Sequence, residues 1–141
     1  MANPLYDTLF GRHAGRTAPF LYLPDGSTLS YDAFLRLTAQ YAHSFRDAGL
    51  APGDRLAAQV EKSPQALAVY AACVQAGIVF LPLNTGYTAD ELEYFVTDSG
   101  ARLLLCDGAK ADALAPVAKS AGASLMTLNA DGSGSLPDAA K

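Results

Sequence analysis

Few residues in this chain combine chemical reactivity with a position where a fold could use it. Glu61, Lys62 and Ser63 come between a short apolar run and a helical pattern, so they occupy a loop that leads from a strand into a helix. Folds of the α/β class place ligands at such loops. A loop that only connects the two elements is the simpler interpretation, and the sequence does not exclude either one.

Acidic residues gather at the start of another helical segment. Asp90, Glu91 and Glu93 stand close together there, and paired carboxylates can act as general acid and base. However, Thr88 followed three residues later by Glu91 forms a capping-box pattern. Carboxylates are also stabilised at the positive end of a helix dipole. We therefore predict a structural role for these acids.

The histidines offer no recognisable centre. His13 and His43 are the only two in the chain, and neither has a Cys, His or Asp partner at metal-ligand spacing. A nucleophilic triad could be assembled only from Ser99, His43 and Asp98. Nothing in the sequence positions these three together, so we predict that His43 lies on a polar helix surface.

The remaining candidates also have simple structural interpretations. The stretch from Asp131 to Gly134 follows a predicted strand, but it lacks the Lys-Ser/Thr pair of a phosphate loop and the third glycine of a dinucleotide motif. We expect a solvated loop there. Asp107 ends a predicted strand, as a phospho-acceptor would, but no acidic partners accompany it. Cys73 and Cys106 lie in apolar contexts and are expected to be reduced core thiols.

Capping and periodicity signals define the elements that would position such groups. Four residues are predicted to be N-caps, each followed by a helix: Asn3, Ser30, Ser63 and Thr88. A further helix is predicted from Lys110 to Ser120, with a kink at Pro116. Two strands around a Pro-Asp-Gly turn predict a hairpin: Pro19 to Leu23 and Thr28 to Leu29. Four more strands alternate with the later helices: Arg55 to Val60, Ile78 to Leu81, Ala101 to Cys106, and Ser124 to Leu128. The βαβαβαβ order predicts an α/β fold, with a parallel sheet, right-handed crossovers and helices on both faces.

One helix is unusually apolar. Residues 65–75 have almost no polar face, which is typical of a helix buried on most sides. The strands that contain Val79 to Leu81 and Leu103 to Leu105 are apolar on both faces, as buried parallel strands are. A four-stranded sheet in 141 residues cannot easily cover such a helix twice, so we expect that this chain is part of a larger protein.

Composition excludes several classes of protein. Half of the residues are hydrophobic and 17% are charged, which favours a packed core over disorder. The net charge of −4 and the scattered positions of the ten Lys and Arg residues argue against a nucleic-acid surface. No apolar run approaches the ~20 residues that span a bilayer. The N-terminus lacks the pattern of a signal peptide, so we expect a soluble, cytoplasmic domain.

Several ordered segments resemble the adenylate-forming (AMP-binding) acyl-CoA synthetases. Leu29 to Phe34 is similar to that family's early Leu-Ser/Thr-Tyr motif, with Phe34 where Leu is usual, and Gly53 to Ala57 is similar to its Gly-Asp-Arg strand entry. Val74 to Asn84 is the most specific match, resembling the Ala-Gly-x-x-Tyr/Phe-x-Pro-Leu-Asn motif. The match covers nearly the whole chain. Four stretches look most like malonyl-CoA synthetases: Glu61 to Ser63, Pro82 to Thr88, Glu91 to Phe95, and Asp131 to Leu136.

The resemblance implies a reaction that this chain does not complete by itself. Enzymes of the family join a carboxylate to ATP, with Mg²⁺, and then transfer the acyl group to coenzyme A. Their Gly/Ser/Thr-rich phosphate loop, acidic ribose ligand and catalytic Lys have no counterpart here. We therefore assign no catalytic, cofactor-binding or metal residue to this chain.

The resemblance also implies a domain organisation and partners. Residues 1–141 would be the N-terminal part of the large adenylate-forming domain, without the rest of that domain and without the C-terminal lid. Its expected partners are a small carboxylic acid, the remainder of the polypeptide and further copies of itself. A stand-alone α/β binding or signalling module and an adenylation domain of a peptide synthetase are the alternative interpretations.

Overall fold

The capping residues predicted from the sequence set the starts of four helices in the computed structural model, which describes residues 2–141. The side chains of Asn3, Ser30, Ser63 and Thr88 each accept a hydrogen bond from the backbone amide three residues later. These predictions are confirmed. The helices are α1 (Pro4–Leu9), α2 (Tyr31–Asp47), α3 (Pro64–Ala76), α4 (Ala89–Ser99), α5 (Ala111–Ala121) and α6 (Ser135–Ala139), with short 3-10 helices η1 (Gly11–His13) and η2 (Gly108–Lys110).

Two sheets hold the strands. The hairpin is confirmed as an antiparallel pair of β1 (Pro19–Tyr22) and β2 (Thr28–Ser30). The main sheet is parallel throughout, as predicted, and has the order β4-β3-β5-β6. Its strands are β3 (Arg55–Gln59), β4 (Val79–Pro82), β5 (Leu103–Cys106) and β6 (Ser124–Thr127).

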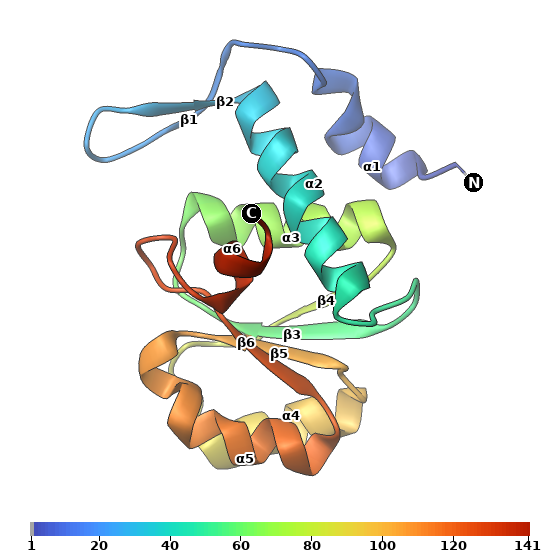
Figure 1. Cartoon of the computed structure of the whole chain (residues 1–141), viewed down its shortest axis with the longest axis vertical. Coiled ribbons are helices and arrows are strands. Elements are labelled where there is room, and N and C mark those ends of the chain that lie inside the picture. The colour runs from blue at the N-terminus through green and yellow to red at the C-terminus, as the bar shows by residue number, and fades with distance from the viewer. Residues whose placement is uncertain (1) are drawn as a thin grey trace.

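Helices cover both faces of the main sheet (Figure 1). On one face lies α3, and α2 packs across it, with α1 and the hairpin beyond. On the other face lie α4 and α5. Each face has its own apolar core: one contains Phe34, Phe45 and Val69, and the other contains Leu92 and Val96. The α/β architecture predicted from the sequence is therefore present.

The sheet and α2 cover part of helix α3 and leave Leu67 37% exposed, so this chain covers the helix incompletely, as expected. The small residues of α3 face the sheet and α2 together, and six of its thirteen residues are buried: Ala68, Val69, Ala71, Ala72, Cys73 and Ala76. Helix α2 supplies the second cover, through Phe34, Tyr41 and Phe45 among others. Alanine-rich helices allow such close approach because their side chains are short.

Other predictions need correction at the ends of elements. Strand β4 lies at the edge of the sheet, and Val79 is 51% exposed, so this strand is not buried on both faces. Lys110 belongs to η2 and precedes α5, whose first residue is Ala111. Helix α6 was not predicted, because Gly and Ser residues precede it and it has only five residues. It nevertheless buries Leu136 completely.

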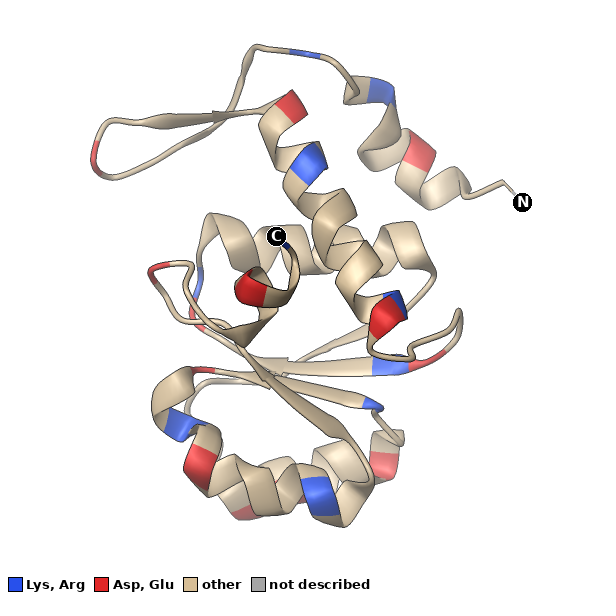
Figure 2. Cartoon of the chain, in the orientation of Figure 1, with Lys and Arg blue, Asp and Glu red and all other residues tan. Residues whose placement is uncertain are grey.

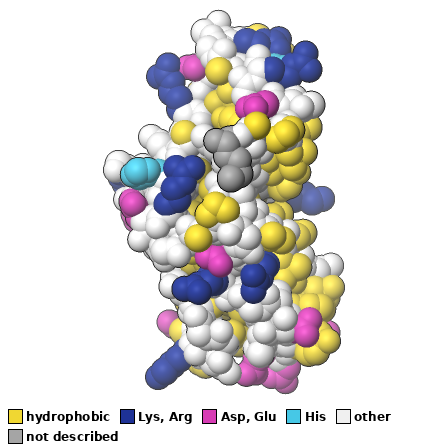
Figure 3. Space-filling model, turned by 90° about the vertical axis from the view of Figure 1, so that its right-hand side faces the viewer, with side chains coloured by type: hydrophobic (Ala, Val, Ile, Leu, Met, Phe, Trp, Pro, Cys, Tyr) yellow, Lys and Arg dark blue, Asp and Glu magenta, His cyan; other side chains and the backbone are white. Residues whose placement is uncertain are grey.

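The surface carries scattered charge and one apolar side. Lys and Arg are distributed among helices and loops and do not gather on one face (Figure 2). Figure 3 shows apolar side chains running along one side of the molecule. Large exposed apolar side chains occur on α1, α3, β4, α4 and the loop before α4: Leu5, Leu9, Leu67, Val79, Tyr87 and Tyr94. Among residues 2–141, no helix combines the length and the apolar character needed to cross a membrane.

Candidate functional site

The order of the strands creates a crevice at the carboxyl ends of β3 and β5. The chain passes from β3 to β4 through α3 on one face, then returns across β3 through α4 on the other face to reach β5 (Figure 1). Neighbouring strands whose connections leave on opposite faces form a topological switch point, where doubly wound α/β folds bind ligands. Gln59 ends β3 at this point, and Asp107 follows β5.

A hollow of about 490 Å³ opens beside this crevice, between the loops that follow β3 and β4. It is lined by Val60, Glu61, Lys62, Leu83, Asn84 and Thr85. The structure therefore places the predicted Glu61-Lys62 pair at the carboxyl edge of the sheet, together with the Asn84 segment of the family motif. Ammonium, carboxylate, amide and hydroxyl groups surround the hollow, so it can hold a polar ligand by hydrogen bonds.

Gln59 is a residue of this edge that the sequence analysis missed. Its side chain is only 1% exposed, and its Nε2 donates to the carbonyl oxygens of Asn84 at 2.9 Å and Tyr87 at 3.1 Å. Its Oε1 has no hydrogen-bond partner among the described residues. The available signal was a lone amide at the end of the apolar run that starts at Leu56, because a buried polar side chain needs a specific partner.

Lys110 was also missed as a site residue. Its Nζ donates to the carbonyl oxygen of Thr85 at 2.8 Å, which joins the segment after β5 to the loop after β4. Lys110 has no carboxylate within ion-pair distance among the described residues. The switch point is therefore bridged by a cation that neutralises no charge of this chain.

The other candidates serve the fold. Asp107 caps η2, since its Oδ1 accepts from the Ala109 amide at 2.8 Å. The side chain of Glu91 accepts from the Thr88 amide at 2.7 Å, which completes the predicted capping box. Glu93 accepts from the Ser120 hydroxyl at 3.1 Å. Asp107 and Glu91 are engaged in local structure and Glu93 links α4 to α5, so the structural role predicted for Glu91 and Glu93 is confirmed.

The structure does not bring Ser99, His43 and Asp98 together. His43 lies on α2, on the opposite side of the sheet from α4, which carries Ser99 and Asp98 (Figure 1). The Ser99 hydroxyl donates to the Val96 carbonyl oxygen at 3.2 Å. His43 is exposed, as predicted, and lies 3.9 Å from Asp47. A triad of these residues is therefore excluded.

The loop around Asp131 is stabilised by its own side chains. Asp131 Oδ1 accepts from the amide of Ser133 at 2.9 Å and from its hydroxyl at 2.5 Å, and these bonds lower the pKa of the carboxyl group. The Gly132 amide donates to the Asn129 carbonyl oxygen at 2.9 Å. Because these amides already have partners, the loop does not form a phosphate cradle.

Both cysteines are buried free thiols, as predicted, one in each core. Burial raises the pKa of Cys73 to about 12 and that of Cys106 to about 11. A nucleophilic cysteine needs the opposite shift, toward the thiolate. Among residues 2–141 there is also no group of three His, Cys, Asp or Glu side chains placed to hold a metal ion.

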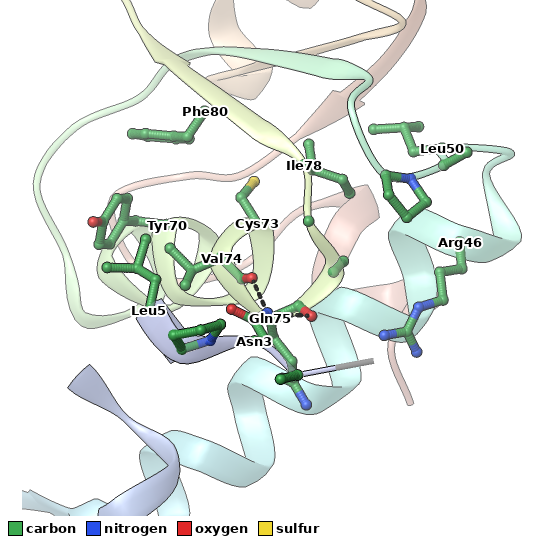
Figure 4. A pocket seen from close by; sticks show the side chains of 16 residues that line it. Asn3, Leu5, Arg46, Leu50, Tyr70, Cys73, Val74, Gln75, Ile78 and Phe80 are labelled. Carbon is green, nitrogen blue, oxygen red and sulfur yellow. Dashed lines mark hydrogen bonds between the residues drawn. The ribbon is translucent and has the colours of Figure 1, made fainter. Parts of the chain in front are cut away.

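An apolar groove of about 870 Å³ lies on the face of the sheet that α3 covers, between α1, α3 and β4 (Figure 4). Leu5, Tyr70, Val74 and Phe80 provide its apolar walls. Asn3 lies at one end of the groove, where its Nδ2 donates to the carbonyl oxygens of Val74 at 2.8 Å and Gln75 at 3.3 Å. These bonds attach the start of α1 to the end of α3.

Comparison with known proteins identifies the relatives of this chain. The crystal structure of MatB from Rhodopseudomonas palustris superposes with a TM-score of 0.94 and is 41% identical, over 99% of this chain and 28% of that protein. A benzoate CoA ligase from Burkholderia xenovorans LB400 has the same fold, with a TM-score of 0.83 at 21% identity, over 96% of this chain and 27% of that one. A structure of the R. palustris MatB with bound ATP matches equally well.

Curated sequences agree with the structural matches. Feruloyl-CoA synthase from an Amycolatopsis species is 39% identical over 66% of this chain and 19% of its own length. The fatty acid–[acyl-carrier-protein] ligase ScoC of Streptomyces coeruleorubidus is 38% identical over 60% of this chain and 16% of its own. This chain thus spans less than a third of the length of each of these relatives.

The described geometry and these matches rule out the signalling-module interpretation. The profile of the AMP-binding enzyme family covers residues 9–139, which is nearly the entire chain and includes both sheets. The segments that resemble the family motifs occupy the expected elements, with the Val74 to Asn84 motif running from the end of α3 through β4. The chain belongs to the AMP-binding enzyme family, whose adenylate-forming acyl-CoA ligases it matches over their N-terminal segment.

Proposed function

We propose that residues 1–141 are the N-terminal part of the large domain of an acid–thiol ligase that activates malonate. The observation that carries this proposal is the 41% identity with MatB, a malonyl-CoA synthetase, over 99% of this chain. The rest of the large domain and a C-terminal lid would complete the enzyme. Relatives named for ferulate and oxalate match 66% and 58% of this chain at 39% and 32% identity, so malonate rests on the MatB match.

The proposed reaction has two steps. A malonate carboxylate oxygen bonds to the α-phosphorus of ATP as pyrophosphate leaves, and the resulting acyl-adenylate is then attacked at its carbonyl carbon by the thiol of coenzyme A, which releases AMP. ATP, Mg²⁺ and coenzyme A are the required partners. The described residues provide no ligand set for the metal and no phosphate loop, so we assign neither step to a residue of this chain.

The contribution of this chain is the ligand-facing edge of one sheet. The hollow beside Lys62 and Asn84 lies at the carboxyl ends of β3 and β4, where a doubly wound fold receives ligands. We infer that these residues line part of the path of a substrate in the complete enzyme. The buried packing of α3 between the sheet and α2 would keep this edge rigid.

A chimera provides the test. Residues 1–141 would replace the matching segment of R. palustris MatB, a design favoured by the solved structures of chimeras between that MatB and BxBclM. Turnover of malonate, ATP and coenzyme A is expected, with kcat/KM at least about tenfold higher for malonate than for acetate or benzoate. Unsubstituted MatB is the control. A folded chimera that forms no acyl-adenylate from any acid would contradict the proposal.

The acid that is activated distinguishes the alternative function, an adenylation domain of a peptide synthetase, from the proposed acid–thiol ligase. Tyrocidine synthase 3 of Brevibacillus parabrevis is 31% identical over 55% of this chain, so an adenylation domain of a peptide synthetase is a second candidate. Such a domain activates an amino acid. Faster pyrophosphate exchange with an amino acid than with malonate, measured on the polypeptide that contains this chain, would favour that candidate.

A further inference from the structure

Two side chains, one at the end of β3 and one in η2 after β5, hold the loop that follows β4. We call residues 84–87 the switch loop. Gln59 donates to the carbonyl oxygens of Asn84 and Tyr87, and Lys110 donates to that of Thr85. Three of the four carbonyl groups in the loop are therefore fixed by donors that lie 25 to 28 residues away in the sequence.

Bonds within the switch loop complete its order. The Asn84 Oδ1 accepts from the Gly86 amide at 2.8 Å, and the Asn84 carbonyl oxygen accepts from the Tyr87 amide at 3.1 Å. The ring of Tyr87 stacks on Phe95 of α4, with centroids 5.2 Å apart and planes inclined by 26°. The switch loop is thus held by bonds within itself, by the donors Gln59 and Lys110, and by the packing of Tyr87 on Phe95.

The burial of Gln59 has a cost that packing does not explain. Its amide is almost completely removed from water while Oε1 has no partner, and an unpaired buried polar atom is unfavourable. The preceding strand residues Ala57 and Ala58 show that small apolar side chains fit in this strand. Residues that conflict with good packing are expected where function requires them.

We propose that Gln59 and Lys110 are positioning residues that fix the switch loop as one wall of the substrate-binding hollow. The loop contributes Asn84 and Thr85 to that hollow, opposite Glu61 and Lys62. A wall that is already ordered removes the entropy cost of ordering it when a substrate binds. The proposal rests on the proposed function, since it assigns the loop to a substrate of the ligase.

The role predicts an effect on binding and not on the chemical step. Neither residue needs to contact the reacting atoms, because both act through the carbonyl groups of the loop. Loss of a preformed wall weakens substrate and transition state alike, which raises KM and leaves kcat unchanged. A residue that merely stabilises the fold would instead reduce the amount of active enzyme, which lowers apparent kcat without changing KM.

Amide hydrogen exchange of the 141-residue chain tests the loop directly. In the variants Gln59→Leu and Lys110→Met, we expect the amides of Gly86 and Tyr87 to exchange about tenfold faster, because the loop has lost a hydrogen bond that holds it. Amides in the middle of α3 should not change. Matched controls are Gln75→Leu and Lys119→Met, whose side chains make no hydrogen bond to the loop. Unchanged exchange at Gly86 and Tyr87 in both variants would overturn the proposal.

Kinetics of the MatB chimera test the role in the reaction. Lys110→Met is expected to raise the KM of one of the three substrates about tenfold and to change kcat less than about twofold. Lys110→Arg keeps a cationic donor and should restore the KM. A lower kcat with all three KM values unchanged would overturn the role. If the unsubstituted chimera is inactive, the proposed function fails, and the exchange experiment still decides whether the two residues hold the loop.

Discussion

Thr127 and Ser135 pair reciprocally at the outer edge of β6. The amide of Thr127 donates to the hydroxyl of Ser135 at 2.8 Å, and the amide of Ser135 donates to the hydroxyl of Thr127 at 2.9 Å. A free edge strand offers unpaired backbone groups to other chains. The pair therefore closes one edge of the sheet with the start of α6. At the opposite edge, Pro82 ends β4 with a residue that has no amide hydrogen to donate.

Removal of this pair should destabilise the protein measurably. Ser135→Ala leaves the Thr127 amide without its partner, so we expect a loss of about 1–2 kcal/mol in the free energy of unfolding, measured in urea. Thr127→Val should cost a similar amount, and the double variant little more than either one, because both remove the same interaction. Ser124→Ala, exposed on the same strand, is the control and should change stability by less than about 0.5 kcal/mol. Additive losses would show that the two residues do not act as a pair.

Gly134 is expected to be irreplaceable for a steric reason. Its φ is +138°, and a Cβ atom there would overlap the carbonyl oxygen of Thr127. We expect Gly134→Ala to lower the free energy of unfolding by at least about 3 kcal/mol. Gly26→Ala is the matched control, because Gly26 has a φ of +85° with no atom within 4 Å of the added Cβ. It should cost only about 1 kcal/mol. Equal costs would mean that the backbone angle and not the contact is decisive.

The two thiols should resist alkylation until the protein unfolds. Burial raises the pKa of Cys73 to about 12 and that of Cys106 to about 11, from an ordinary value of 9.0. The thiolate is the reactive form, so iodoacetamide at pH 8 should label neither residue without urea and both above the unfolding midpoint, as measured by mass spectrometry.

The same shifts define a pH dependence of stability. Each thiol has a folded-state pKa above its unfolded value, so the unfolded state loses its proton first as the pH rises. The stabilisation is complete below pH 9 and declines as the pH rises from 9 toward 11 and 12. Cys73→Ala should make the unfolding midpoint less sensitive to pH in that range, whereas rapid labelling of native Cys73 at pH 8 would disprove the burial argument.

The isolated chain is expected to self-associate. Its accessible surface of 7557 Å² exceeds the roughly 6,900 Å² of a compact monomer of its mass. Apolar side chains run along one side of the molecule (Figure 3), and α1, α3, β4 and α4 each carry a large exposed apolar residue. At ~25 cal/mol per Å², covering 400 Å² of that side would yield about 10 kcal/mol before the costs of association.

Light scattering coupled to size-exclusion chromatography measures this association. Val79→Lys places a charge on the exposed edge strand and should shift the chain toward a monomer. Tyr22→Lys changes a more exposed position, 78% against 51% for Val79, on the distant hairpin and is the control. If the unaltered chain is a monodisperse monomer at 50 μM, its exposed apolar side chains do not drive association, and the prediction is wrong.

The chain alone should not form an acyl-adenylate. It contains no phosphate loop and no group that we assign to catalysis, and its titratable residues at the switch point serve as caps or loop supports. Incubation with malonate, ATP, Mg²⁺ and coenzyme A should therefore release no pyrophosphate above a heat-denatured control. The MatB chimera, assayed in parallel, shows that the reagents are competent.

Local signals in the sequence predicted the elements well, and long-range partnerships much less. An N-cap such as Ser63 and a helix-ending glycine such as Gly77, whose φ is +73°, act within a few residues, so they can be recognised without the fold. The alternation of strands and helices likewise predicted a parallel sheet. The covering of α3 by α2 was not predicted, because apolar periodicity shows that a helix face is buried but not which element buries it.

The hydrogen bonds that hold the switch loop could not be predicted from the sequence, because they also join residues far apart in the chain. Gln59 and Lys110 bind backbone carbonyl groups, which every residue possesses, so no pattern at positions 84–87 reveals the partnership. Only the strand order, with β3 between β4 and β5, brings the two donors to the same loop. The family motif around Asn84 indicated the correct region without indicating what holds it.

The bonds of Asn3 have a consequence for the order in which the chain acquires structure. One side chain caps the start of α1 and the end of α3, although its partner Val74 lies 71 residues further along. A ribosome adds about 5–20 residues per second, so roughly 4 to 14 seconds separate the synthesis of Asn3 from that of Val74. α1 has only six residues and buries none of them, too little to be stable alone. Helix α1 is therefore synthesised well before α3 but becomes ordered only once α3 is present.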